Sequence, residues 1–341
     1  MIKFSLRVNS KASILILTLW ALCLVASFAV IIGSGIRQKM LLVRRLNERD
    51  LGYLLCEAAA KTGISVIRQH GEEPFMALKE SWSNNPGAFK AVNLGDGQFS
   101  VCYIYTDECR SESALRYGMM DEERKINVNT ADAEVMARLF MAVVCDLQEP
   151  EALEMAEAIV DWRDSDQGGG SLGGGAEDFY YRGLQFPYSA KNANIQVLDE
   201  LLLIKGFPVS VFNTVSEYLT VYGSGRINVN TASKPVLVAL GLDDELSQKI
   251  IGFRAGEDTI EATEDDRVFK SADTIAADLI EVYHLSESEI VQLGKVSAQH
   301  LDVSSQHFMI KSTADIGSRK GLMKATCVID AEGKILYWQE S

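Results

Sequence analysis

The stretch from Ser13 to Ile32, SILILTLWALCLVASFAVII, contains 20 residues without a charged side chain. A helix that crosses a bilayer needs about 20 apolar residues, so this stretch predicts a transmembrane helix. The apolar part of a secretory signal peptide is shorter, at about 7–15 residues, and no clear small-x-small cleavage box follows directly. We therefore expect this segment to be retained as a membrane anchor.

Basic residues lie on both sides of the apolar run. The residues before it favour a cytoplasmic N-terminus, whereas those after it favour the opposite orientation, because Lys and Arg concentrate on the cytoplasmic side. Charge counting therefore leaves the orientation open. The residues concerned are Lys3, Arg7 and Lys11 before the run, and Arg37, Lys39, Arg44 and Arg45 after it.

A helical pattern continues beyond the apolar run, with residues recurring at steps of three and four. The stripe consists of Ile36, Met40, Val43, Leu46 or Asn47, Asp50 or Leu51, Leu54 and Ala58. The Gly33-Ser34-Gly35 step interrupts the stripe and predicts a kink. A helix from Ser13 to about His70 would be roughly 85 Å long. We expect its first half to lie in lipid and its second half to pack on a domain.

The rest of the chain is strongly acidic. The 341 residues carry a formal net charge of −14, and residues 1–40 contain five basic and no acidic side chains, so the remainder carries −19. Such a body disfavours binding to phosphate backbones, which are bound through clustered Lys and Arg. It suits divalent cations or basic partner surfaces.

The cysteines show no metal-binding spacing such as CxxC, which disfavours a zinc site. Cys102 and Cys109 flank a short acidic segment and could be bridged in an oxidising compartment. The alternative is that most of the cysteines are small core residues.

The two ends of the body predict a small sheet. Ala88–Leu94 and Gln98–Thr106 have strand composition around a hairpin turn at Asp96-Gly97. Three further strands are predicted at His307–Lys311, Lys324–Ile329 and Lys334–Trp338. A sheet built from both ends and packed on the long helix would make an α+β domain, with about 121–300 as an insertion.

The insertion contains an internal repeat. Lys125-Ile-Asn-Val-Asn-Thr-Ala131 recurs as Arg226-Ile-Asn-Val-Asn-Thr-Ala232, and each copy leads into a predicted helix, 132–140 or 233–240. We expect the apolar residues to be buried and the Asn side chains to satisfy nearby backbone groups. The N-caps would be either Thr130 and Thr231 or the residues two positions on, Asp132 and Ser233.

An acidic, glycine-rich segment lies inside the insertion. Two acidic side chains fall one helical turn apart, and more follow across the Gly168–Gly175 loop. Several carboxylates brought together across a loop suit Ca²⁺, which takes six to eight oxygen ligands. The alternative is a solvated acidic loop in which Glu177 or Asp178 caps the next helix. The candidate ligands are Asp161, Asp164, Asp166, Glu177 and Asp178.

Catalysis finds little support, because the four histidines are scattered and neither a nucleophile elbow nor a phosphate loop is present. A calcium-dependent hydrolase or adhesin therefore lacks a catalytic set.

Helix-hairpin-helix DNA-binding modules also use an INxNTA entry. Here, however, Asp243 stands in place of the second hairpin glycine, and the carboxylates of Asp243 and Asp244 would face the phosphate, which disfavours DNA.

The sequence resembles the K-type minor pseudopilins of type II secretion systems over nearly its whole length. Lys11–Trp20 is similar to the family's prepilin-peptidase site, and the resemblance implies cleavage between Ala12 and Ser13. Leu17 stands where most pseudopilins have Glu, and the lack of that Glu is characteristic of the K type. Further matches are the MDEERKINVNTA entry, the DWRDSD…GAEDFYY segment and the ILYWQE strand near the C-terminus.

The resemblance implies an α+β fold in which a pilin-like domain carries a large insertion of two SAM-like, helix-hairpin-helix-like domains. The expected limits are a leader at 1–12, a transmembrane helix at 13–33, a pilin-like domain at 34–120 and 301–341, and SAM-like domains at 121–222 and 223–300.

The resemblance also implies a non-enzymatic role. The chain would sit in the bacterial inner membrane with its body in the periplasm, cap the pseudopilus tip and bind calcium. Implied partners are the I- and J-type minor pseudopilins, then the H-type and major pseudopilins, the inner-membrane platform and prepilin peptidase, but no nucleic acid. The competing function is a membrane-tethered DNA-binding protein of a DNA-uptake system.

Overall fold

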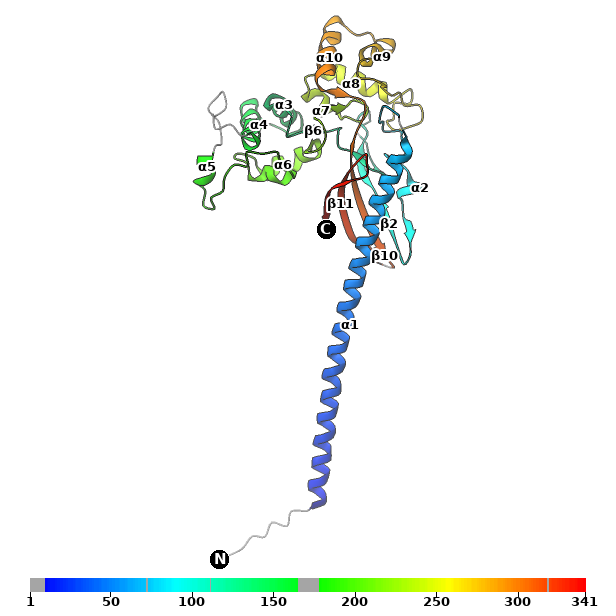
Figure 1. The fold of residues 1–341 in the computed structure, drawn as a ribbon, viewed down its shortest axis with the longest axis vertical. Coiled ribbons are helices and arrows are strands. Elements are labelled where there is room, and N and C mark those ends of the chain that lie inside the picture. Colours follow the sequence, from blue (N-terminus) through cyan, green and yellow to red (C-terminus); the bar gives the residue numbers. More distant parts are fainter. Residues whose placement is uncertain (1–9, 72, 111, 165–177, 318) are drawn as a thin grey trace, which may run out of the picture. The chain divides into compact units, whose positions relative to one another are not determined.

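The computed structural model describes residues 10–71, 73–110, 112–164, 178–317 and 319–341. The chain divides into two compact units, one that ends at Leu54 and one from Leu55 to Ser341. Helix α1 (Ser10–His70) supplies the described part of the first unit and the start of the second. The second unit combines helices with strands (Figure 1), which confirms the predicted α+β class. The five predicted domain limits stay a prediction.

Helix α1 has 61 residues and is about 90 Å long at 1.5 Å per residue. It runs through Gly33, Ser34 and Gly35 as continuous helix, and the kink predicted at these residues stays a prediction. A Cβ atom at either glycine would meet no atom within 4 Å. Large apolar side chains of α1 from Ile14 to Leu46 are exposed.

The buried face of α1 in the second unit differs from the predicted stripe. Leu54 is 55% exposed, whereas Leu55 is buried. The residues that continue this face are mostly small, and they are Cys56, Ala59, Ala60, Val66 and Ile67. Small side chains let the helix approach the sheet closely, so the buried face follows size as well as hydrophobicity. A Cβ atom at Gly63 would lie 2.7 Å from Ile310 Cδ1, which explains the glycine.

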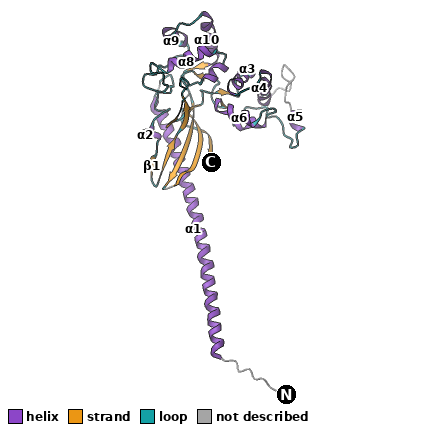
Figure 2. Ribbon diagram, turned by 180° about the vertical axis from the view of Figure 1, so that it is seen from behind, coloured by secondary structure: helices purple, strands orange, loops and turns teal. Residues whose placement is uncertain are grey.

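An antiparallel sheet forms one side of the second unit (Figure 2). Its strand order is β1-β2-β10-β11-β12, and the short strand β5 also pairs with β10. The first two predicted C-terminal strands fall within longer strands, and the third begins one residue before the strand that the structure contains. The bounds are β1 Val92–Leu94, β2 Gly97–Val101, β5 Met120–Asp121, β10 His307–Ile316, β11 Arg319–Asp330 and β12 Ile335–Glu340.

The predicted strand at Ala88–Leu94 is wrong in its first part, which forms the short helix α2 (Pro86–Phe89). The side chain of Asn85 accepts a hydrogen bond from Ala88 N and caps this helix, and Pro86 suits its first turn. A local cap therefore outweighs the strand composition.

The predicted hairpin turn is displaced by one residue. Leu94 pairs with Gly97, so the two turn residues are Gly95 and Asp96. Gly95 has φ 58°, a value that favours glycine at the first position of such a turn.

The predicted strand Gln98–Thr106 is divided at Cys102, whose N–H donates to Lys311 O. Beyond this point, β3 (Tyr103–Thr106) leaves the main sheet and pairs with β4 (Ser113–Arg116) in a separate hairpin. The division is a long-range effect, since the hairpin docks on residues far along the chain.

Two helical segments lie between the sheet strands, and a short parallel strand pair closes each of them. The first helical segment (126–220) contains β6 Ile126–Asn127, α3 Ala133–Val143, α4 Glu149–Arg163, α5 Asp178–Arg182, the 3-10 helix Leu198–Leu203, α6 Val209–Val215, the 3-10 helix Ser216–Tyr218 and β7 Leu219–Thr220. The second helical segment (227–302) contains β8 Ile227–Asn228, α7 Lys234–Ala239, α8 Asp244–Arg254, α9 Ile275–Val282, α10 Glu287–His300 and β9 Leu301–Asp302.

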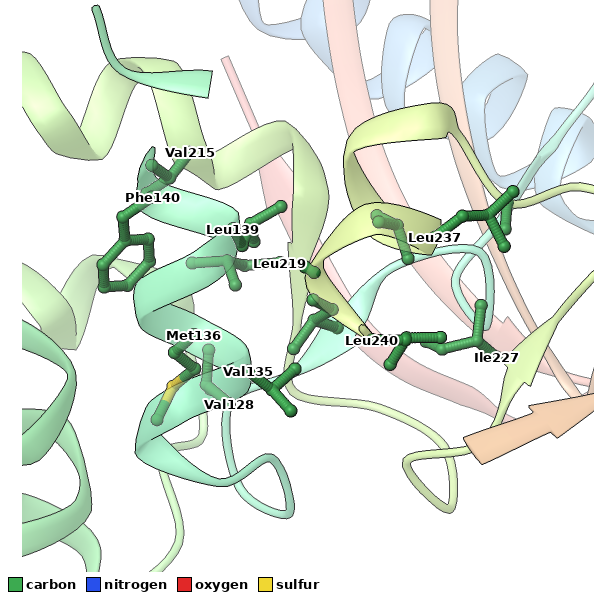
Figure 3. Packing of buried hydrophobic residues seen from close by; sticks show 14 of the residues in the cluster. Val128, Val135, Met136, Leu139, Phe140, Val215, Leu219, Ile227, Leu237 and Leu240 are labelled. Carbon is green, nitrogen blue, oxygen red and sulfur yellow. The ribbon is translucent and has the colours of Figure 1, made fainter. Parts of the chain in front are cut away.

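The predicted helix entries of the repeat are confirmed, with Asp132 and Ser233 as N-caps. The two helical segments share one hydrophobic core. Figure 3 shows α3 side chains such as Val135 facing Leu240 of the second segment. Burying apolar surface is the main favourable term in folding, so this shared core holds the segments together.

Candidate functional site

The candidate membrane anchor is the first part of α1. Among the described residues, α1 is one helix long and apolar enough to cross a membrane. The peptide bond between Ala12 and Ser13 lies near the start of this helix, which begins at Ser10. Cleavage at this bond stays a prediction, as does the leader at 1–12, of which residues 1–9 lie outside the described residues.

The candidate calcium ligands lie around a segment that is only partly described. Asp161 lies in the last turn of α4, Asp164 follows that helix as its C-cap, and Asp178 begins α5. Asp166 and Glu177 fall outside the described residues. Within the described part of the chain, no three potential ligand side chains form a metal-binding group. Calcium binding therefore stays a prediction.

Aromatic contacts nevertheless join the two ends of this acidic segment. Trp162 of α4 contacts Tyr181 of α5 edge to face, with ring centroids 5.2 Å apart, and Tyr188 contacts both. Burial raises the pKa of Tyr181 to about 12, so the phenol stays neutral. The backbone near Asp161 and Asp178 is therefore held together by a packed aromatic cluster.

Cys102 and Cys109 are both free thiols in the structure, and the possible bridge between them stays a prediction. Strand β3 separates them, and four extended residues span about 13 Å, whereas bridged Cα atoms lie within about 7 Å. Burial and the nearby charge of Glu261 raise the pKa of Cys109 to about 11, which lowers its reactivity.

The repeated asparagines carry out the backbone pairing that the sequence predicts. Asn129 Nδ2 donates to Ile195 O, and its Oδ1 accepts from Ile195 N. Asn230 makes the same two bonds with Phe269 in the second copy. Each asparagine side chain therefore satisfies both the N–H and the C=O of one residue in a distant loop, as a neighbouring strand would.

The first asparagine of each copy accepts a hydrogen bond from the backbone two residues on, which closes the turn. Asn127 Oδ1 accepts from Asn129 N, and Asn228 Oδ1 accepts from Asn230 N. Their side-chain amides then donate outward, from Asn127 to Tyr222 O and from Asn228 into a buried acidic cluster.

Sequence reasoning missed that cluster, which we call the acidic junction (Asp121, Glu122 and Glu123). Its signal was the MDEERK run, which precedes the first repeat copy. All three side chains are buried, with exposed fractions of 1%, 1% and 7%. Three consecutive buried carboxylates require matched donors, because an unpaired buried charge is costly.

Each member of the acidic junction binds a different part of the second unit. Asp121 Oδ2 accepts from side chains of the second helical segment and of the loop after it, at 2.5–3.1 Å. Glu122 pairs with Lys125 and accepts from a hydroxyl of the first helical segment. Glu123 binds strand β10 through both carboxylate oxygens. The donors are Asn228, Thr231 and Ser305 for Asp121, Thr220 for Glu122 and His307 for Glu123.

The electrostatics of the acidic junction shift two pKa values upward. Burial, followed by the charge of Glu123, raises the pKa of Asp121 above its usual range. The hydrogen bond from His307 Nδ1 to Glu123 Oε1, at 2.7 Å, raises the pKa of His307. A protonated His307 is therefore favoured as the partner of Glu123.

A second buried ion pair fixes the β3–β4 hairpin to the second helical segment. Arg254 and Glu261 pair directly, with side-chain exposures of 3% and 0%. Tyr105 Oη donates to Glu261 Oε2 at 2.6 Å. Burial alone would raise the pKa of Glu261, but Arg254 and the hydrogen bonds lower it overall, so this carboxylate stays charged.

Comparison with known proteins agrees with the resemblance seen in the sequence. Residues 114–224 match the family model of the first domain of type II secretion system protein K. The chain is 24% identical over 337 residues to type II secretion system protein K of Aeromonas hydrophila, covering 94% of each chain. It is 23% identical over 326 residues to the protein of the same name from Pseudomonas aeruginosa, covering 92% of this chain and 88% of that protein.

The fold is similar to a chain of the crystal structure of the GspK-GspI-GspJ complex from the enterotoxigenic Escherichia coli type 2 secretion system. The TM-score is 0.65 at 17% identity, and the match covers 88% of this chain and 99% of that chain. At this identity the match bears on the fold.

Proposed function

We propose that this chain, a member of the type II secretion system protein K family, caps the tip of a pseudopilus and helps to start its assembly. The role is structural rather than enzymatic. The chain would sit in the bacterial inner membrane through α1, with residues 55–341 in the periplasm, after prepilin peptidase has cut between Ala12 and Ser13.

The exposed part of α1 beyond the apolar run carries this proposal. Met40, Val43 and Leu46 are 68%, 55% and 50% exposed, although a span of about 20 residues already ends near Ile32. Apolar residues at helical spacing on an exposed helix favour packing against another helix. A helix of a second pseudopilin would pack on these residues and bury them.

Leu17 favours a place at the tip. In most pseudopilins, Glu at this position neutralises the N-terminal amine of a neighbouring subunit. A first subunit has no preceding amine to neutralise, so an apolar Leu17 suits that place. The bulk of the two helical segments agrees with this reading, because it would block addition of a further subunit.

The proposed partners follow from these features. The similar crystal structure contains GspK together with GspI and GspJ. By analogy, the I- and J-type minor pseudopilins would bind this chain first, and the H-type and major pseudopilins would follow on the inner-membrane platform. The calcium that we expect at the acidic segment would be a structural ion.

Co-purification tests the proposal. Full-length protein would be co-expressed with I- and J-type minor pseudopilins and extracted in detergent, and we expect one complex of all three. Val43→Asp should weaken the complex, whereas Leu41→Asp, which is 52% exposed and lies on the opposite face of the helix, should leave it intact. Absence of a complex with the unaltered chain, or equal loss in both variants, would refute the proposal.

The competing DNA-binding function is disfavoured by the turn between α7 and α8. Asp243 caps α8, where its carboxylate accepts a hydrogen bond from Leu246 N at 2.8 Å. A helix N-terminus that could bind a phosphate is therefore already occupied by a carboxylate. A mobility-shift assay at low salt should show no binding, and tight, salt-dependent binding would favour this alternative.

A further inference from the structure

Two cysteines without a role in the proposed function lie between α1 and the sheet. Cys56 of α1 is completely buried, and Cys327 of β11 is 1% exposed. Both are free thiols in the structure. The simplest role for a buried cysteine is that of a small core residue. The position of this pair points to a second role.

Strand register places Cys327 diagonally across from Ser312, the residue that acts on the Cys56 thiol. Ile310 pairs with Cys327, and Ser312 pairs with Ala325. Alternate residues of a strand share a face, so these four side chains project to the same side of the sheet. Burial raises the pKa of Cys56 and the hydroxyl of Ser312 offsets part of that rise, which places the thiol near this hydroxyl and over this face.

The helix approaches this face closely. Gly63 lies two turns after Cys56 and rests on Ile310, the strand partner of Cys327. Ala59 and Ala60, between them on the helix, are completely buried. Bridged cysteines need Cα atoms about 4.4–6.8 Å apart, and only small residues at a helix–sheet contact bring the two backbones that near.

The two thiols also interact electrostatically. Burial raises the pKa of Cys327 to about 12, and the charge of a Cys56 thiolate contributes to this shift. Burial raises the pKa of Cys56 as well. Thiol exchange requires a thiolate, so the folded protein would react slowly, and oxidation would take place while the chain folds.

We propose that Cys56 and Cys327 form an intrachain disulfide when the second unit folds in an oxidising compartment, which rests on the proposed export of residues 55–341. One cysteine thiolate attacks a disulfide oxidant and forms a mixed disulfide, and the other displaces the oxidant's sulfur. One sulfur–sulfur bond forms in the chain, the oxidant's disulfide bond breaks, and the two cysteine protons pass to its two sulfur atoms, which leave as thiols. The bond would join the first buried turn of the anchor helix to an inner strand.

Peptide mass spectrometry tests this disulfide directly. The full-length chain would be unfolded and refolded in detergent with glutathione disulfide, alkylated without reductant and digested with trypsin. We expect residues 50–61 to be linked to residues 325–334, with a mass about 2 Da below the sum of the free peptides, and to separate on reduction. Cys102 and Cys109, which share the peptide 91–110, should be alkylated as free thiols. Cys56→Ala/Cys327→Ala provides the control that cannot link.

The outcomes separate this proposal from the proposed function. Alkylated Cys56 and Cys327 after refolding, or linkage of either to a different cysteine, would overturn the disulfide. A second sample, taken from membranes without refolding, reports on the compartment. If the link forms with glutathione disulfide but not in membranes, the pairing stands and export of the body is in doubt.

Discussion

Arg163 and Arg254 occupy equivalent positions, because each donates to the two carbonyl groups that frame its own copy of the repeated turn. Arg163 lies at the end of α4 and donates to Val128 O and Ala131 O. Arg254, at the end of α8, donates to the carbonyls of Val229 and Ala232 at 2.9 and 2.7 Å. One planar guanidinium therefore fixes the turn to the end of a following helix in both segments.

The two arginines should differ in their importance for stability. Arg254→Met would leave Glu261 charged and buried without its partner, so we expect a loss of about 3–5 kcal/mol in the free energy of unfolding. Arg163→Met mainly removes hydrogen bonds to two carbonyls, and we expect about 1–3 kcal/mol. Urea unfolding of the full-length variants measures both. Equal losses would contradict the role assigned to Glu261.

Asn230 should not tolerate replacement by the isosteric acid. Asn230→Asp places carboxylate oxygen against Phe269 O, where the amide now donates at 2.9 Å, and it buries a charge. We expect a loss of roughly 2–4 kcal/mol, because a satisfied pair becomes a repulsive one. Asn93→Asp, at an exposed position, provides the control and should change the unfolding midpoint little.

The sequence predicts features that depend on neighbouring residues. The length of α1, the C-terminal strands and the Asn turns of the repeat follow from local periodicity and side-chain chemistry, and the structure contains them. Their physical cause lies within a few residues, so a single sequence suffices to find them.

The features that were missed depend on residues far apart in the chain. Asp121 binds Ser305 and Asn228, which lie 184 and 107 positions away. The hairpin β3–β4 leaves the sheet because Tyr105 binds Glu261, 156 positions away. The residues next to Glu261 and Asp121 in the sequence do not reveal the distant groups that bind these carboxylates. Both residues therefore appear in the sequence as ordinary surface charges.

The His307–Glu123 pair should make stability depend on pH. The pKa of His307 is raised in the folded state, so its contribution is fully present below the ordinary value of 6.5 and is lost as the pH rises through the folded value. We therefore expect the full-length protein to lose about 1 kcal/mol relative to His307→Asn between pH 6 and pH 9.

His300 offers the matched control for this prediction. Burial lowers the pKa of His300, so its contribution is present above pH 6.5 and is lost as the pH falls. Thermal unfolding would be measured across pH for the unaltered protein, His307→Asn and His300→Asn. The stability difference between the unaltered protein and each variant should change with pH in opposite directions for the two variants. Slopes of the same sign would contradict the assignment of His307 to a charged pair.

Calcium should stabilise the full-length protein through the acidic segment. Trp162, Tyr181 and Tyr188 already hold the two ends of that segment together, so an ion there would bind carboxylates whose backbone is partly fixed. A ligand that binds only the folded state at 100 times its dissociation constant adds about 2.7 kcal/mol. We expect the melting temperature to rise with Ca²⁺ and to fall with a chelator.

Variants locate the ion. Asp161→Asn and Asp164→Asn remove one carboxylate each at the described end of the segment, and both should reduce the calcium-dependent shift, because Ca²⁺ affinity follows ligand charge. Asp273→Asn, at an exposed position in the second helical segment, should retain the full shift. If the melting temperature of the unaltered protein does not change when Ca²⁺ is added, the calcium prediction is wrong. The acidic segment would then be a solvated loop whose carboxylates repel one another without a bound cation.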